Sequence, residues 1–106
     1  MSEPTARSLI EDRYGAVAGV FAALASPVRA AIVHRLTLGG ETVGRLSDEL
    51  GISQPLTSQH LRTLRLHGLV AVDRNGREAT YRLSDEHVAH VFLDALQHSR
   101  EDTTPA

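Results

Sequence analysis

The sequence predicts one mainly α-helical domain that carries a single small β-hairpin. Apolar residues recur at helical spacing through most of the chain. Two segments alternate instead, and they are separated by Asn75-Gly76, a pair typical of tight hairpin turns. A chain of 106 residues is long enough for one core but not for two. We therefore expect a single domain over residues 1–106.

Capping residues mark the first two predicted helices. Residues 6–24 have helix-like apolar spacing. The next helix has Ser26 as its N-cap and Pro27 at its first position, where proline is well tolerated. It stops at Gly39-Gly40.

The second half of the chain continues with a short helix over VGRLSDEL, which Gly51 ends. Ser53 caps a longer helix that runs to Gly68, the alternating hairpin follows over 69–83, and Ser84 caps a last helix over 84–101. A short helix, a glycine turn, a longer helix and a hairpin make a winged helix-turn-helix, with the helix-turn-helix at 42–68 and the wing at 69–83.

The helix after Ser53 has side chains suited to reading DNA. Its first half presents short or amide side chains that hydrogen-bond base edges and phosphates, whereas Leu56, Leu61 and Leu64 are expected to face the core. Residues 53–83 hold five arginines against two carboxylates, although the whole chain has a net charge of -2. The alternative is an ordinary amphipathic surface helix. The predicted contacts on this helix are Ser53, Gln54, Thr57, Ser58, Gln59, His60 and Arg62.

The hairpin tip adds two further predicted DNA contacts. Arg74 and Arg77 flank Asn75-Gly76, so both guanidinium groups lie near a protruding turn that can reach a phosphate or a minor groove. The alternative is a solvated turn, because arginine is common in turns. Asp73 and Glu78 beside them dilute the local charge.

Composition excludes several classes of site. The chain has no cysteine, so disulfides, thiolate nucleophiles and thiolate metal sites are excluded. It has no bilayer-length apolar run and no signal-peptide pattern at its start, so we expect a cytoplasmic protein without a membrane partner. We also expect no enzyme, because no nucleophile elbow or phosphate loop is present and little chain is left to build a pocket.

The last helix, DEHVAHVFLDALQHSRE, gathers three histidines and four carboxylates. At 100° per residue its polar groups form one narrow stripe opposite its apolar side chains. His87 and His98 share this stripe but lie roughly 16 Å apart along the axis, too far to bind one ion within a chain. In an antiparallel twofold dimer, Asp85 and His87 of one chain would meet His98 and Glu101 of the other, which suits tetrahedral Zn(II). The alternatives are surface hydrogen bonds at i,i+4 and carboxylates that simply favour a helix N-terminus.

The segments LASPVRAAIVHRL, SQPLTSQHLRTLRLHGLV and DRNGREATYRLSDEHV, in this order, resemble the ArsR/SmtB family of metal-responsive repressors over roughly residues 15–101. The zinc-sensing branch places D-x-H-x10-H-x2-E/H on its last helix as interchain ligands. Asp85, His87, His98 and Glu101 fill that pattern without a gap. His90 lies on the same stripe but outside the pattern and stays unassigned, and His34 and His67 are interpreted as structural.

The resemblance implies a homodimer whose contacts are made by the helices at 6–24 and 84–101. Such a dimer binds twofold-symmetric operator DNA when metal-free and releases it on binding Zn(II), with Co(II) or Ni(II) as other candidates. We hypothesise that His98 contacts the backbone near Gly68 and so links the metal site to the DNA-reading helix. The alternative function is a winged-helix regulator without a metal effector, which answers to a partner protein or a small molecule.

Overall fold

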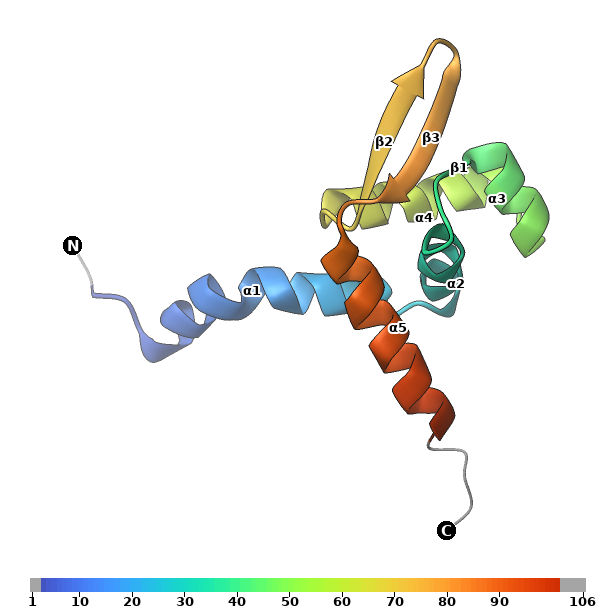
Figure 1. The fold of residues 1–106 in the computed structure, drawn as a ribbon. Coiled ribbons are helices and arrows are strands. Elements are labelled where there is room, and N and C mark those ends of the chain that lie inside the picture. Colours follow the sequence, from blue (N-terminus) through green and yellow to red (C-terminus); the bar gives the residue numbers. More distant parts are fainter. Residues whose placement is uncertain (1–2, 102–106) are drawn as a thin grey trace.

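The computed structural model describes residues 3–101, and residues 1–2 and 102–106 lie outside this description. The elements in chain order are α1 (Ala6–Leu24), α2 (Pro27–Leu36), β1 (Glu41–Thr42), α3 (Val43–Leu50), α4 (Gln54–Leu66), β2 (Val70–Asn75), β3 (Glu78–Leu83) and α5 (Glu86–Glu101). The β2–β3 hairpin, α1 and α5 project in three directions from the helices between them (Figure 1). This arrangement confirms the predicted winged helix-turn-helix fold.

The hydrophobic core lies where α2, α3 and α4 meet and is closed by the start of β2 and by α5. Its apolar members lie at helical spacing, with Ile32 and Val33 four and three residues before Leu36 on α2 and Leu61 three residues before Leu64 on α4, and they form one continuous cluster. The buried apolar residues are Ala23, Ile32, Val33, Leu36, Leu46, Leu61, Leu64, Leu69, Val70 and Phe92. The helix-turn-helix is therefore held on a rigid base.

Most of the predicted helix caps are present. The hydroxyl of Ser26 accepts the backbone N–H of Arg29 at 3.2 Å, and the hydroxyl of Ser53 accepts that of Leu56 at 3.3 Å. The cap predicted for α5 is wrong by one residue. Asp85, not Ser84, precedes this helix, and its Oδ1 accepts the N–H of Val88 at 3.1 Å.

The sheet has a third strand that the sequence did not predict. β1 pairs with β3 and gives the antiparallel order β1-β3-β2. A two-residue strand is too short for an alternating pattern, so only its tertiary pairing defines it. Gly40 permits this pairing, because a Cβ at Gly40 would lie 2.9 Å from Thr80 Cγ2 and 3.2 Å from the Tyr81 carbonyl oxygen.

The turn of the wing also lies one residue further along than predicted. Asn75 is the last residue of β2 and pairs with Glu78, which leaves Gly76 and Arg77 as a two-residue loop. Gly76 has a φ of 65°, which suits the first loop position of a type II′ turn. Arg77 therefore sits within the loop itself, and Arg74 lies on β2.

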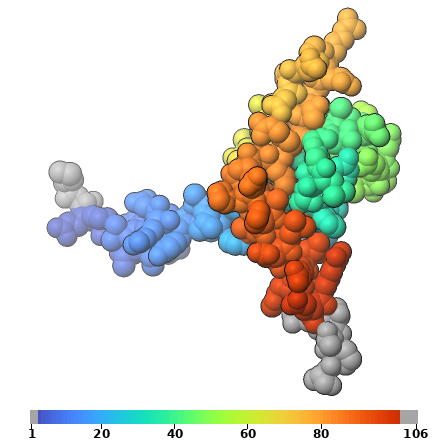
Figure 2. Space-filling model, viewed as in Figure 1, coloured from blue at the N-terminus to red at the C-terminus, as the bar shows by residue number. Residues whose placement is uncertain are grey.

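α1 is an arm that stands out from the body (Figure 2). Of its residues, only Ala23, near the end that joins the body, is buried. Large apolar side chains remain exposed along the arm at helical spacing: Leu9, Ile10, Tyr14, Val17 and Phe21. A contiguous apolar stripe of this kind marks a contact surface for another molecule.

Within residues 3–101, no single helix is both long and apolar enough to cross a membrane. α1 and α2 pass that test only together, as a pair bent by 95°.

Candidate DNA-binding surface and effector site

The helix-turn-helix is built from α3, the turn at Gly51 and α4. Gly51 adopts a left-handed conformation with a φ of 70°, which ends α3 and redirects the chain into the α4 cap at Ser53. The start of α3 then packs against Gln54, because a Cβ at Gly44 would lie 3.1 Å from Gln54 Nε2. The first residue of α4 is thereby held in place by α3.

One face of α4 is exposed and polar, as a DNA-reading surface requires. Ser53, Gln54, Ser58, Gln59 and Arg62 are exposed, as is Arg65 one turn later. Amide and hydroxyl groups at the start of a helix with arginines behind them can contact base edges and flanking phosphates. These predicted residues stand together on one exposed surface.

Thr57 does not belong to this surface, and its predicted DNA contact is corrected. Its side chain is buried, with an exposed fraction of 0%, and its hydroxyl donates to the Ser53 carbonyl at 2.8 Å. Leu56, which was expected in the core, is 38% exposed. The reason is rotational. Thr57, Leu61 and Leu64 are spaced by four and three residues and form the buried ridge, whereas Leu56 lies about 100° away from Thr57.

His60 is also placed differently from the exposed polar residues. Its ring is partly buried, and its Nδ1 lies 3.4 Å from Nη1 of Arg29 on α2. It therefore faces the neighbouring helix α2 and not the exposed polar face. Nothing in the sequence indicated this contact, because the two residues are far apart along the chain.

The wing presents Arg74 and Arg77 as exposed side chains. Asp73, which the sequence placed beside them as a diluting charge, instead accepts a hydrogen bond from Arg82 Nε at 2.7 Å. The acid next to Arg74 is thus engaged by an arginine further from the tip. Within the described residues 3–101, no ion pair engages the guanidinium group of Arg74 or Arg77.

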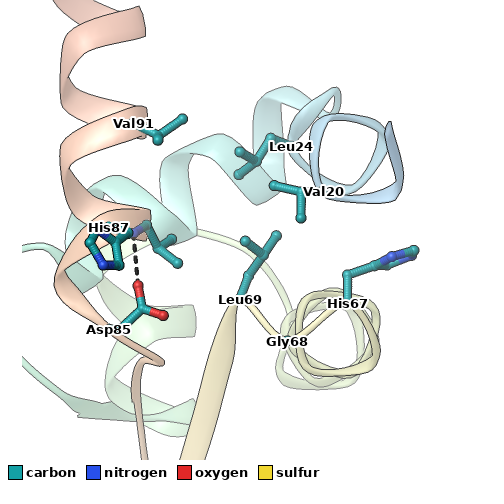
Figure 3. A pocket seen from close by; sticks show the side chains of 9 residues that line it. Val20, Leu24, His67, Gly68, Leu69, Asp85, His87 and Val91 are labelled. Carbon is teal, nitrogen blue, oxygen red and sulfur yellow. Dashed lines mark hydrogen bonds between the residues drawn. The ribbon is translucent and has the colours of Figure 1, made fainter. Parts of the chain in front are cut away.

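Asp85 and His87 mark one end of the candidate effector site. Both line a hollow of about 240 Å³ whose other walls come from α1, from the residues after α4, and from α5 itself. Gly68 and Leu69 belong to the same hollow. In Figure 3 the Asp85 carboxylate turns back to cap α5, so Oδ1 is occupied by the helix.

His98 and Glu101 mark the other end, in the last turn of α5. Glu101 accepts a hydrogen bond from Gln97 Nε2 at 3.2 Å and lines a second hollow with His34 and Arg100. Within residues 3–101 of one chain, no three His, Asp or Glu side chains come close enough together to hold a metal ion. Two pairs of ligand-type groups therefore stand at opposite ends of one helix.

The remaining histidines are placed as follows. His90 lines a hollow with Asp85, Glu86 and His87, so it belongs to the N-terminal end of α5. The His34 ring lies 5.8 Å from the Phe92 ring, and His67 packs on α1, where a Cβ at Gly19 would lie 3.1 Å from its Nδ1. The His67 ring points away from Asp85 and His87 in Figure 3. Both are packing contacts of exposed residues, and the structural role of these histidines stays a prediction.

Comparison with known proteins assigns the family. A helix-turn-helix domain model matches residues 24–73. The chain is 51% identical over 80 residues to the transcriptional repressor SmtB of Mycobacterium tuberculosis, covering 76% of this chain and 59% of that protein. It is 42% identical over 83 residues to the transcriptional regulator NmtR of the same organism, covering 78% of this chain and 69% of that protein. The chain belongs to the ArsR/SmtB family.

Solved structures agree with membership of the ArsR/SmtB family. A homodimeric winged helix-turn-helix DNA-binding domain from Mycobacterium bovis, described as a possible ArsR-family regulator, superposes with a TM-score of 0.85. The two share 28% sequence identity, and the match covers 98% of this chain and 94% of that chain. ArsR/SmtB proteins are DNA-binding transcriptional regulators and not enzymes, in line with the expectation of no catalytic site. The match spans only about three fifths of the length of the SmtB repressor.

Proposed function

We propose that this protein is a metal-responsive transcriptional repressor. As a homodimer it binds twofold-symmetric operator DNA when metal-free and releases it when Zn(II), or Co(II) or Ni(II), binds between its two α5 helices. The exposed polar face of α4 and the two arginines of the wing support the DNA-binding part. The relatives in Mycobacterium tuberculosis are bacterial, and bacterial genomic DNA lies in the cytoplasm, so we propose that this repressor works there.

The proposed dimer uses the faces of α1 and α5 that the single chain leaves uncovered. On α1 the stripe includes Tyr14, Val17 and Phe21, with exposed fractions of 53%, 48% and 58%. On α5, Val91 is 45% exposed and lies about 40° in rotation from His87. Burying these side chains against a second copy removes apolar area from water, which is the main force for stable association.

The observation that carries the effector proposal is the separation of two ligand pairs along α5. Asp85 and His87 lie at its start and His98 and Glu101 at its end, all four are exposed, and the rise of the helix keeps the two pairs roughly 16 Å apart. Two imidazole nitrogens and two carboxylate oxygens are a suitable donor set for tetrahedral Zn(II). An antiparallel α5 pair would complete two such sites by symmetry.

His90 extends this donor set at one end only. It lies with Asp85 and His87 and away from His98, so it is available as an additional ligand for a metal that prefers six donors. We keep Co(II) and Ni(II) beside Zn(II) for this reason.

Coupling to DNA would run through the hollow beside Gly68. Asp85 and His87 share that hollow with the segment that ends α4, so a metal bound there sits next to the reading helix. His98 lies at the far end of its own α5, so the hypothesised contact near Gly68 requires the partner's His98. Metal then clamps the two α5 helices in a geometry that favours the free dimer over the DNA-bound one.

The first test is operator binding by fluorescence anisotropy with and without Zn(II). Wild-type protein is expected to lose affinity on metal addition, whereas His87→Ala and His98→Ala keep metal-free binding and lose the response. Unchanged DNA binding at saturating metal would reject the sensor and leave a winged-helix regulator that answers to another effector. Absence of DNA binding in metal-free protein would reject the repressor itself.

A mixed dimer tests whether the sites lie between chains. A heterodimer of His87→Ala with His98→Ala places both defects in one site and leaves the other complete. It should therefore recover about one strong metal site per dimer, although each homodimer has none. Sites formed within single chains would give no recovery on mixing.

A third variant tests the contact near Gly68. His98→Asp keeps an oxygen ligand but lacks the second ring N–H that could bond to backbone. We expect metal binding with weakened DNA release. Full release of operator DNA by a His98→Asp protein that still binds metal would contradict a coupling through the backbone near Gly68.

A further inference from the structure

Arg29 stands at the junction of three helices. It lies in the first turn of α2, its Nε donates to the Ala23 carbonyl of α1 at 2.6 Å, and its Nη1 lies 3.4 Å from His60 Nδ1 on α4. Its own backbone N–H is held by the Ser26 cap at 3.2 Å. One partly buried guanidinium thus contacts the end of the α1 arm and the middle of the reading helix.

The contact with Ala23 is the stronger of the two. Carbonyls in the last turn of a helix lack intrahelical partners, and a cation near a helix C-terminus is favoured by the helix dipole. The short Nε to oxygen distance is that of a charge-assisted hydrogen bond. This bond fixes the plane of the guanidinium group, and the direction of Nη1 follows from it because the group is rigid.

The contact with His60 sets the chemistry of that ring. A guanidinium group only donates hydrogen bonds, so a hydrogen bond here requires His60 Nδ1 to accept, which corresponds to the neutral tautomer with its proton on Nε2. A separation of 3.4 Å is long for a nitrogen–nitrogen hydrogen bond, so its contribution is orientation more than stability. The ring is held on the α2 side of α4, about 160° around the helix from the exposed Ser58 and Arg62.

We propose that Arg29 is a positioning residue that fixes the orientation of the reading helix α4 relative to the α1 arm. This inference rests on the proposed function, in which α1 joins the two copies and α4 enters the major groove. In a symmetric dimer the distance between the two reading helices is set by how each α4 is held against its own α1. Arg29 therefore determines which half-site spacing the dimer accepts.

The test compares Arg29→Met and Arg29→Lys with wild type on operators whose half-sites are moved apart or together by one or two base pairs. Wild type is expected to prefer one spacing. Arg29→Met is expected to lower that preference on the order of fivefold, because it removes the hydrogen bond to the Ala23 carbonyl together with the longer contact to His60. Arg29→Lys keeps the charge but lacks the rigid fork, so it is expected to lie between them.

Arg35→Met is the matched control. Arg35 is another partly exposed arginine of α2, with ion pairs to Glu41 and Glu49, so its loss also weakens the fold. Within residues 3–101 its side chain contacts Glu41 of β1, Glu49 of α3 and the Gly39 carbonyl, and none of these lies in α1 or α4. We expect lower stability and an unchanged spacing preference. Equal changes in both variants would reduce Arg29 to a general structural role and overturn the proposal.

A second readout needs no DNA. Nitrogen-15 NMR of the His60 ring should show the proton on Nε2 in wild type and a mixture of tautomers in Arg29→Met. An identical His60 spectrum in wild type and Arg29→Met would overturn the inference. If the wild type fails to bind any operator, the proposed function falls and this spectrum still decides the Arg29–His60 contact.

Discussion

Asp85 Oδ1 accepts the backbone N–H of Val88 at 3.1 Å, so a residue proposed to bind metal is also the cap of the helix that presents the other three ligands. The cap fixes the carboxylate beside His87 before any metal arrives. One oxygen serves the helix and the other is left for a cation. Such preorganisation lowers the ordering cost of binding.

Asp85→Asn is therefore expected to separate the two roles. Asparagine caps a helix about as well as aspartate, whereas Asp85→Ala removes the cap and costs about 1 kcal/mol of stability. Both variants should bind metal more weakly. Urea unfolding in the presence of a chelator and metal titration measure the two effects separately. Equal metal affinity in Asp85→Asn and wild type would exclude Asp85 as a ligand.

Thr57 and Ser58 should behave oppositely although they are neighbours. Thr57→Val removes a buried hydroxyl that bonds to the Ser53 carbonyl, so it should cost about 1 kcal/mol of unfolding free energy and leave operator affinity unchanged. Ser58→Ala changes an exposed hydroxyl, so it should weaken operator binding with stability unchanged. Denaturation and anisotropy on the same samples check both. Weaker DNA binding by fully folded Thr57→Val would contradict the buried placement.

The wing arginines should be visible in the salt dependence of DNA binding. Arg77→Ala removes a guanidinium group at the tip, and each lost phosphate contact should reduce the slope of log K against log salt by about 1. Arg82→Ala is the control, because Arg82 is paired with Asp73 away from the tip. Anisotropy over a range of salt concentrations gives the slopes. Identical slopes for Arg77→Ala and wild type would show that the tip does not touch phosphate.

A charge in the α1 stripe should prevent dimer formation. Phe21→Asp places a carboxylate on the exposed apolar face and should weaken self-association on the order of 100-fold. Asp12→Arg, on the opposite side of the same helix, is the control. Sedimentation equilibrium measures the association constants. A dimer of undiminished strength in Phe21→Asp would move the interface away from α1.

Local chemistry made much of the fold predictable. Ser26, Ser53 and Gly51 act on backbone groups within a few residues, so their caps and turns could be recognised from the sequence. The errors in the last helix cap and in the wing turn were small shifts between adjacent residues of similar chemistry. Ser84 and Asp85 are both good caps, and the two neighbouring turn pairs of the wing both contain Gly76. A pattern of residue types cannot decide between such neighbours.

The sequence by itself determined the order of the five helices and the hairpin, the absence of thiolate chemistry, and the rule that the outer histidines of α5 cannot share an ion within one chain. These follow from composition, capping and helix rise, which are properties of the chain alone. Only the tertiary structure decided that Thr57 is buried while Leu56 is exposed, that β1 joins the sheet, and that Asp85 lies beside Gly68. The contact between Arg29 and His60 is likewise visible only in the tertiary structure. Each of these depends on contacts between segments distant in sequence, for which no local pattern exists.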